Sequence, residues 1–106
     1  MRIVSESGHA WPEPTEDLIF EALAEVAGGR EEFLILEDTQ DAYGETYVQA
    51  VTDGDGGFLV ERRDGSADHH FRTTCPSIDA AHRVVVGWAF PPDPEADTVA
   101  WQRVGV

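Results

Sequence analysis

The chain has 106 residues and a formal net charge of −14, set by 21 Asp and Glu against seven basic residues, all of them Arg. This length suits one domain with one hydrophobic core, and a hydrophobic fraction of 42% is too high for a disordered acidic chain. A negative field of this size repels nucleic acid and anionic membranes and speeds encounter with basic partners. We therefore expect a single domain over residues 1–106 that binds neither nucleic acid nor a membrane.

The acidic residues are unevenly distributed. Residues 1–60 hold 14 of them with only Arg2 and Arg30 as basic residues, whereas residues 61–106 hold seven together with five Arg. The N-terminus has no basic flank followed by an apolar run, and the single Cys75 cannot form an internal disulfide. These features favour a cytoplasmic protein whose acidic surface is formed mainly by the first sixty residues.

The first predicted element is a helix that follows an irregular N-terminal arm. Two prolines keep residues 1–14 out of helical conformation. Thr15 is the expected N-cap, and two carboxylates follow it in the first turn, where the helix dipole favours negative charge. Apolar residues then recur at helical spacing up to Gly28, which ends the helix; they are Leu18, Ile19, Ala22, Leu23, Val26 and Ala27.

Four strands are predicted next, as an antiparallel meander. They cover residues 33–36, 46–52, 58–63 and 69–73. The first is a continuous apolar run, which predicts a central strand covered on both faces. The stretches between the later strands are rich in Gly and Asp, residues that favour tight turns.

A second helix and a last strand complete the predicted order. Ser77 is the expected N-cap of a helix whose apolar face includes Ala81 and Val85, and two prolines end it at or before Phe90. The last strand is expected at 98–104. The fold predicted is α+β, an antiparallel sheet of about five strands with two helices packed on one face, in the order α-β-β-β-β-α-β.

Two patterns suggest metal sites, and each has a simpler explanation. Asp53 and Asp55 alternate with glycines as in a calcium loop, but an EF-hand needs an oxygen ligand, Gly and Glu where this chain has Gly57, Phe58 and Asp64. A hairpin turn is the favoured interpretation. The possible zinc ligands are His69, His70, Cys75 and His82, but adjacent residues on a strand point to opposite faces.

A thiol enzyme is the remaining catalytic alternative. Cys75 lies just before the second helix, where backbone dipoles can lower the pKa of a thiol, and His70 or His82 could serve as its base. No third group that would orient such a base is recognisable in the sequence. We therefore expect a protein that is not an enzyme, with no catalytic residue, metal or cofactor.

The acid on the first helix and after it is the candidate binding feature. Asp17, Glu21 and Glu25 are spaced by four and so form one row, in which each like-charge pair costs about 0.2–0.5 kcal/mol. Such a row is either a solvated surface or a docking stripe for the Arg and Lys of a partner, and both interpretations stay open. Trp11 and Tyr43 lie in irregular segments beside acidic residues, where an exposed aromatic residue could anchor an interface. The predicted partner-binding residues are Asp17, Glu21, Glu25, Glu37, Asp38, Asp41, Tyr43 and Glu45.

Three segments carry a resemblance to a known family. They are the entry through Glu31-Glu32 into residues 33–36, the segment 47–65 with its Asp-Gly-Asp-Gly-Gly turn, and the closing strand around Trp101. In this layout the chain resembles the small immunity proteins of bacterial polymorphic toxin systems, specifically the immunity protein one family. The resemblance implies a cytoplasmic, non-enzymatic protein that binds a cognate toxin, often a nuclease, and blocks it.

The leading hypothesis is therefore an acidic binding protein with a basic protein partner such as a toxin domain. The alternative is a small structural or regulatory domain that self-associates or joins a larger assembly, in which the acid serves only solubility.

Overall fold

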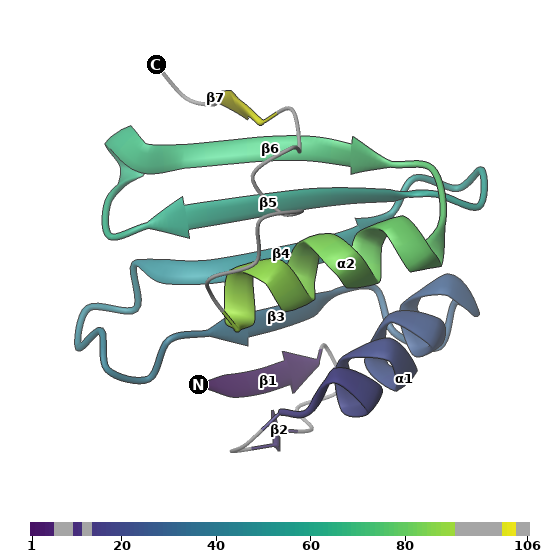
Figure 1. The fold of residues 1–106 in the computed structure, drawn as a ribbon, viewed down its shortest axis with the longest axis horizontal. Helices are drawn as coiled ribbons and strands as arrows, with labels where there is room; N and C mark the ends of the chain where they lie inside the picture. Colours follow the sequence, from purple (N-terminus) through teal and green to yellow (C-terminus); the bar gives the residue numbers. More distant parts are fainter. Residues whose placement is uncertain (6–9, 12–13, 91–100, 104–106) are drawn as a thin grey trace.

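The computed structural model describes residues 1–5, 10–11, 14–90 and 101–103. Within these ranges the chain forms one antiparallel sheet of seven strands in the order β2-β1-β3-β4-β5-β6-β7 (Figure 1). The strands are β1 (Arg2–Ser5), β2 (Ala10–Trp11), β3 (Leu34–Glu37), β4 (Thr46–Thr52), β5 (Phe58–Asp64), β6 (His70–Cys75) and β7 (Gln102–Arg103). The helices are α1 (Glu16–Ala27) and α2 (Ile78–Ala89), and a short 3-10 helix η1 (Ala67–His69) precedes β6.

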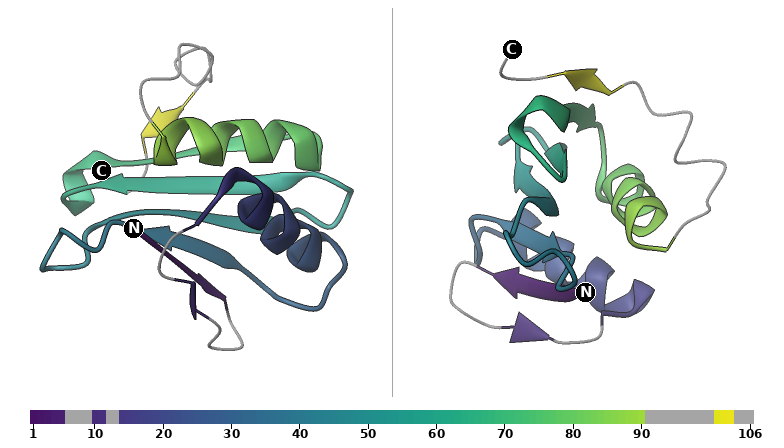
Figure 2. Two further views of the ribbon diagram at one scale, coloured as in Figure 1. Left: turned by 60° about the horizontal axis from the view of Figure 1, so that its bottom comes forward. Right: turned by 90° about the vertical axis from the view of Figure 1, so that its left-hand side faces the viewer.

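The predicted α+β class is confirmed, with both helices on the same face of the sheet (Figure 2, right). The predicted order and strand count are roughly matched, but the arm over residues 1–14 is not irregular throughout, because β1 and β2 lie in it and extend the sheet beyond β3. β1 pairs with β3 along its four residues, and only Ile3 and Ser5 in it are buried. An alternation of buried and exposed residues over only four positions is difficult to recognise in a sequence.

The ends of the later strands also differ from the prediction. η1 occupies residues 67–69, so β6 begins at His70 and continues to Cys75. In the predicted strand at 98–104, the structure assigns only Gln102 and Arg103 to β7; residues 98–100 and 104 lie outside the described ranges.

Both predicted N-caps are confirmed. The Thr15 hydroxyl oxygen accepts a hydrogen bond from the Leu18 backbone N–H at 3.1 Å, and the Ser77 hydroxyl oxygen accepts one from Ala80 N–H at 3.2 Å. The first backbone N–H groups of a helix have no carbonyl partner within the helix, and each hydroxyl oxygen accepts from one of them. α1 ends at Gly28, as predicted from the Gly pair.

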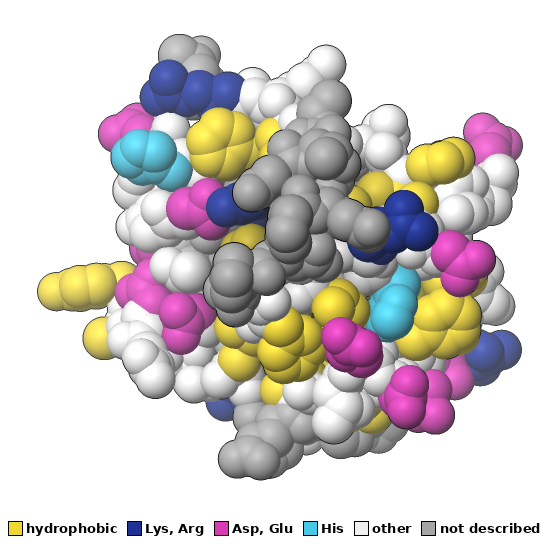
Figure 3. All heavy atoms as spheres, viewed as in Figure 1, with side chains coloured by type: hydrophobic (Ala, Val, Ile, Leu, Met, Phe, Trp, Pro, Cys, Tyr) yellow, Lys and Arg dark blue, Asp and Glu magenta, His cyan; other side chains and the backbone are white. Residues whose placement is uncertain are grey.

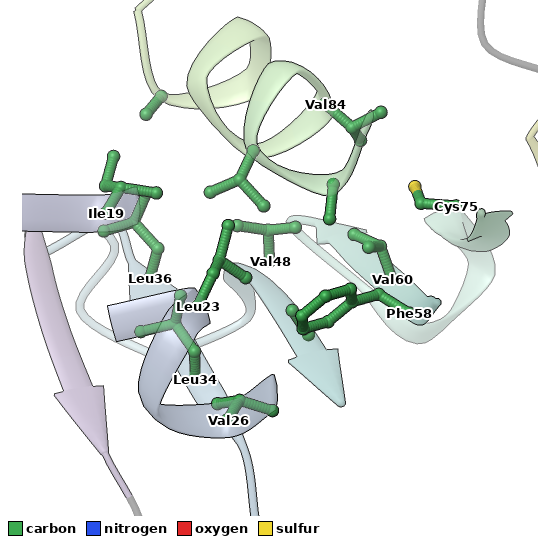
Figure 4. Close-up of a cluster of buried hydrophobic side chains, with 14 of the residues drawn as sticks. Ile19, Leu23, Val26, Leu34, Leu36, Val48, Phe58, Val60, Cys75 and Val84 are labelled. Atoms are coloured by element: carbon green, nitrogen blue, oxygen red, sulfur yellow. The ribbon is translucent and has the colours of Figure 1, made fainter. Parts of the chain in front are cut away.

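The core lies between the helices and one face of the sheet. Ile19, Leu23 and Val26 of α1 meet Leu34 and Leu36 of β3, with side chains of β4, β5 and α2 beside them (Figure 4). Complete burial of one such side chain contributes about 1.5–3 kcal/mol. The buried side of α1 is therefore what attaches it to the sheet.

In residues 1–5, 10–11, 14–90 and 101–103, no helix lies on the opposite face of the sheet, which corrects the prediction for β3. Leu34 and Leu36 point into the core, whereas Ile35 and Glu37 alternate with them and are only half-buried. The apolar run 33–36 is therefore covered by helices on one face. We call the face without helices the uncovered sheet face.

Strand pairing fixes which residues share the uncovered sheet face. One row runs across five strands, since Glu37 is opposite both Arg2 and Tyr47, and Arg63 is opposite both Tyr47 and His70. All five alternate along their strands with residues on the helix side of the sheet. This row lies at the end of the sheet where β3 leaves for the loop to β4 (Figure 1).

Candidate functional site

The structure divides the eight predicted partner-binding residues between two places. Asp17, Glu21 and Glu25 lie on α1, while Glu37, Asp38, Asp41, Tyr43 and Glu45 lie in or next to residues 38–45, which join β3 to β4 and are called the β3–β4 loop. In Figure 1 this loop is at the left end of the sheet and α1 is at the lower right. Figure 3 shows acidic side chains over α1 and, separately, others on the left of the same view. The eight residues therefore lie in two separate parts of the fold.

Two of the α1 carboxylates are unneutralised. Asp17 and Glu21 are exposed, and neither has a hydrogen-bond or ion-pair partner among the described residues. Glu25 instead forms an ion pair with Arg30 just beyond the helix end. Phe20, beside Glu21, is 37% exposed and packs edge-on against His82 of α2 with ring centroids 5.3 Å apart. The exposed surface of α1 is therefore acidic, with the Phe20 and His82 rings beside its carboxylates.

In the β3–β4 loop, carboxylates hold the backbone in place. One Asp41 oxygen accepts from Tyr43 N–H at 3.0 Å and the other accepts from the Thr46 hydroxyl at 2.7 Å. These two bonds, the Thr46 one foremost, lower the pKa of Asp41 below its ordinary value. An Asp38 oxygen accepts from Gln40 N–H at 2.9 Å, and Asp38 N–H donates to Thr46 O at 2.9 Å. The loop is therefore fixed at several points by its own side chains.

Tyr43 stands at the tip of this fixed loop with 89% of its surface exposed. The next residue, Gly44, has φ +67°, a left-handed conformation that glycine adopts without the steric cost of a Cβ. Its N–H donates to Asp41 O at 3.2 Å. The loop thus presents a large aromatic side chain to solvent from an ordered backbone.

The C-terminal end of the loop is tied to the uncovered sheet face. Glu45 accepts from Arg63 Nη1 at 2.8 Å, and Glu45 O accepts from Gly65 N–H at 2.9 Å. The Glu45 contact raises the pKa of Arg63 above its usual value. The Arg63 guanidinium carbon also lies 5.8 Å from the ring centroid of Tyr47. Glu45 therefore helps to fix the β3–β4 loop through a contact with β5.

His70 continues this connection across the sheet and is only 8% exposed. Its Nδ1 accepts from Arg63 Nε at 3.1 Å, because a guanidinium can only donate. The proton of the neutral imidazole then sits on Nε2, which donates to Glu61 at 3.1 Å. Both ring nitrogens are occupied, so in this arrangement His70 orders the sheet face and has no nitrogen available as a base.

The candidate metal and thiol residues do not form one site. His69 contacts Ser66, His70 lies on the uncovered sheet face, and His82 donates to the Glu16 carbonyl at 2.8 Å. Cys75 is buried in the core on the other side of the sheet, and this burial raises the pKa of its thiol. Within the described ranges, no three His, Cys, Asp or Glu side chains are placed to hold a metal ion.

The Asp53–Gly57 segment is the predicted hairpin turn. One Asp53 oxygen accepts from Asp55 N–H at 2.8 Å and from Gly57 N–H at 3.0 Å, and Asp53 N–H donates to Gly57 O at 3.1 Å. The turn connects β4 to β5, where Thr52 pairs with Phe58.

Two tryptophans pack against the core. Trp88 and Trp101 are partly buried against the core, and Arg62 lies over the Trp101 ring at 5.3 Å. The side chain of Trp11 lies outside the described part of the structure.

Sequence reasoning missed the Glu45–Arg63–His70–Glu61 network. The signal was present as period-two alternation, which places Glu61 with Arg63 and His70 with Arg72 on one face of their strands. What was missing was the register between β5 and β6, in which Arg63 is opposite His70.

The comparisons with known proteins give no match: no protein-family model, curated protein or solved structure matches the chain. In the part of the chain that the structure describes, no helix has the length and apolarity needed to cross a bilayer.

Proposed function

We propose that this protein is a non-enzymatic binding protein for a basic protein partner, with the β3–β4 loop as its anchor. The observation that carries the proposal is Tyr43, 89% exposed on a loop whose backbone is fixed by Asp38 and Asp41. A residue whose backbone is fixed before binding loses less conformational entropy when a partner covers it. Tyrosine is also among the residues that most often dominate binding energy when buried at the centre of an interface.

Charge supplies the second part of the proposal. The net charge of −14 attracts a cationic surface at long range, which raises the association rate more than the affinity. Asp17 and Glu21 on α1 contribute to that field without being neutralised by Arg. In this division of roles, the field sets the association rate and Tyr43 sets the dissociation rate.

The class of partner follows from the resemblance to immunity proteins of polymorphic toxin systems. We propose a basic toxin domain in the cytoplasm, blocked because the acidic protein covers the groove that a nucleic acid would occupy. The chain's acid-rich composition, with 21 Asp and Glu, supports such competition, since it offers carboxylates where the toxin would meet phosphates.

The test is affinity capture from lysate of the source cell in dilute buffer, using wild type, Tyr43→Ala and Phe20→Ala. Phe20 is the matched control because it is a partly exposed aromatic residue on the other acidic surface. We expect wild type and Phe20→Ala to retain the same protein of high isoelectric point, and Tyr43→Ala to lose it. Co-expression with the captured protein should relieve its toxicity only when Tyr43 is present. No basic protein captured, or equal capture by all three, contradicts the proposal.

Self-association through the uncovered sheet face is a second candidate. Its supporting observation is charge balance, because Arg2, Arg63 and Arg72 on or beside this face are offset by Glu37, Glu45 and Glu61. Two copies of a chain with net charge −14 would repel each other least through such a surface. Light scattering at two concentrations tests it, with an unchanged monomer mass as the contradicting result.

A further inference from the structure

We infer that the partner's contact continues from the β3–β4 loop onto the uncovered sheet face, where Arg72 binds a carboxylate of the partner. This inference rests on the proposed function. It adds that the partner surface, although basic overall, presents an acidic residue at a defined place.

Arg72 differs from every other arginine of the chain. Arg2, Arg30, Arg62 and Arg63 form ion pairs with Glu37, Glu25, Asp64 and Glu45. Arg103 donates to the Asp68 carbonyl, and Arg83 also has an interaction partner. Among the described residues, Arg72 has no hydrogen-bond or ion-pair partner, and its side chain is exposed.

The absence of an internal partner is notable because a carboxylate stands opposite. Strand pairing places Glu61 of β5 directly across from Arg72 of β6. Glu61 instead accepts from His70 Nε2 at 3.1 Å, and Gln102 is the neighbour on the β7 side. The carboxylate that strand pairing places opposite Arg72 is therefore bonded to a different residue, and the Arg72 side chain stays exposed on the uncovered sheet face.

The position of Arg72 fits one continuous interface with the loop. β6 is two strands from β4, a separation of about 10 Å, because neighbouring strands lie about 4.8 Å apart. A standard protein interface covers about 800 Å² on each partner, which is wide enough to include the loop and this part of the sheet. Tyr47 of β4 and Arg63 of β5 lie between the two on the same face, and Glu37 of β3 is paired with Tyr47.

Charge complementarity then defines the partner. A basic surface meets the acidic loop and the field of the chain, and one carboxylate forms charge-assisted hydrogen bonds with Arg72. A basic protein without an acid at that point would leave the guanidinium covered and unpaired, which disfavours binding. Arg72 thus selects the cognate partner among the basic proteins that the field attracts.

The experiment measures dissociation constants for the captured partner with Arg72→Glu, Arg72→Gln and the control Arg83→Glu on α2. The charge change is equal in Arg72→Glu and Arg83→Glu, and both make the chain more acidic, which alone would speed association with a basic partner. We expect Arg72→Glu to weaken binding about tenfold or more, Arg72→Gln to weaken it less, and Arg83→Glu to leave it unchanged or slightly tighter. Replacement of the acidic partner residue by Lys should restore binding to the Arg72→Glu variant, because the two charges are then exchanged.

Three results would overturn the inference. If Tyr43→Ala loses the partner while Arg72→Glu binds as tightly as Arg83→Glu, the inference fails and the proposed function stands. If wild type is a dimer that Arg72→Glu dissociates, the face serves a second copy of the chain. If neither Tyr43→Ala nor Arg72→Glu changes capture, the inference and the proposed function both fail. Because the Arg72 side chain is exposed and makes no hydrogen bond or ion pair with the described residues, and because Arg83 is also exposed, circular dichroism should show all three variants folded.

Discussion

α1 and the β3–β4 loop both carry several Asp and Glu residues, but these carboxylates have different structural roles in the two places. On α1, Asp17 and Glu21 face solvent without a partner, and the helix is held by its buried side. In the loop, Asp38 and Asp41 accept backbone and hydroxyl hydrogen bonds, and Glu45 is paired with Arg63. On α1 these residues thus contribute negative electrostatic potential, whereas in the loop they fix the backbone. Local density of acid in a sequence does not distinguish the two roles.

The largest expected difference in the free energy of unfolding is between substitutions on the buried and on the exposed side of α1. Leu23→Ala removes a side chain that is fully buried against the sheet, and it should lower the free energy of unfolding by about 2–5 kcal/mol. Glu21→Ala, two residues away on the exposed side, should change it by no more than about 0.5 kcal/mol. Urea denaturation of both variants checks this. A similar cost for the two would mean that the charges of α1 also hold the helix.

A smaller effect is expected at the ends of the helices. Thr15→Ala removes the oxygen that accepts from Leu18 N–H, and should cost about 1 kcal/mol in the free energy of unfolding. Thr15→Asn, which retains a capping oxygen, is the control and should remain close to wild type. An equal loss in both variants would show that capping is not the cause.

The contribution of the β3–β4 loop to stability should depend on pH through the protonation of Asp41. Its pKa is lowered in the folded protein, so its contribution to stability is present above its ordinary value of 3.8 and is lost as pH falls through the folded value. We therefore expect wild type to exceed Asp41→Asn in melting temperature at pH 6. The gap should narrow progressively below about pH 4. Glu21→Gln, the matched change on α1 at an exposed carboxylate beyond the first turn, should show no such gap, and a gap of equal size there would remove the distinction between the two regions.

The smallest effect concerns the unpaired acid of α1. Replacement of Asp17 and Glu21 together by Gln relieves a like-charge pair worth about 0.2–0.5 kcal/mol but also removes the favourable interaction of Asp17 with the helix dipole, so the free energy of unfolding should change by no more than about 0.5 kcal/mol. Association with the basic partner should slow by a few fold in dilute buffer, and the difference should shrink at physiological salt. Stopped-flow or surface plasmon resonance measures this. A faster dissociation rate instead would place α1 inside the interface.

How much of this was predictable depends on how local the cause is. Thr15 and Ser77 act within one turn of their own helices, so both caps could be predicted from neighbouring residues. β1 could not, because its stability comes from pairing with β3, more than thirty residues later in the chain. The same holds for the uncovered sheet face, since Ile35 and Glu37 are half-buried because both described helices lie on the other face.

The candidate site follows the same rule. Tyr43 was recognisable as an aromatic residue among acids in a loop, and the structure finds it exposed. The role of its neighbours was not recognisable. Whether a carboxylate such as Glu25, Glu37 or Glu45 is neutralised depends on which Arg the fold brings beside it.

The most direct test of the central claim is the backbone order parameter of the Tyr43 amide, measured by ¹⁵N relaxation in the protein without a partner. If the loop carboxylates hold the anchor in place before binding, this value should be about 0.85, as in regular structure, and should fall in Asp41→Ala. A value below about 0.6 in wild type would contradict the account, because Tyr43 would then have to be ordered by the partner.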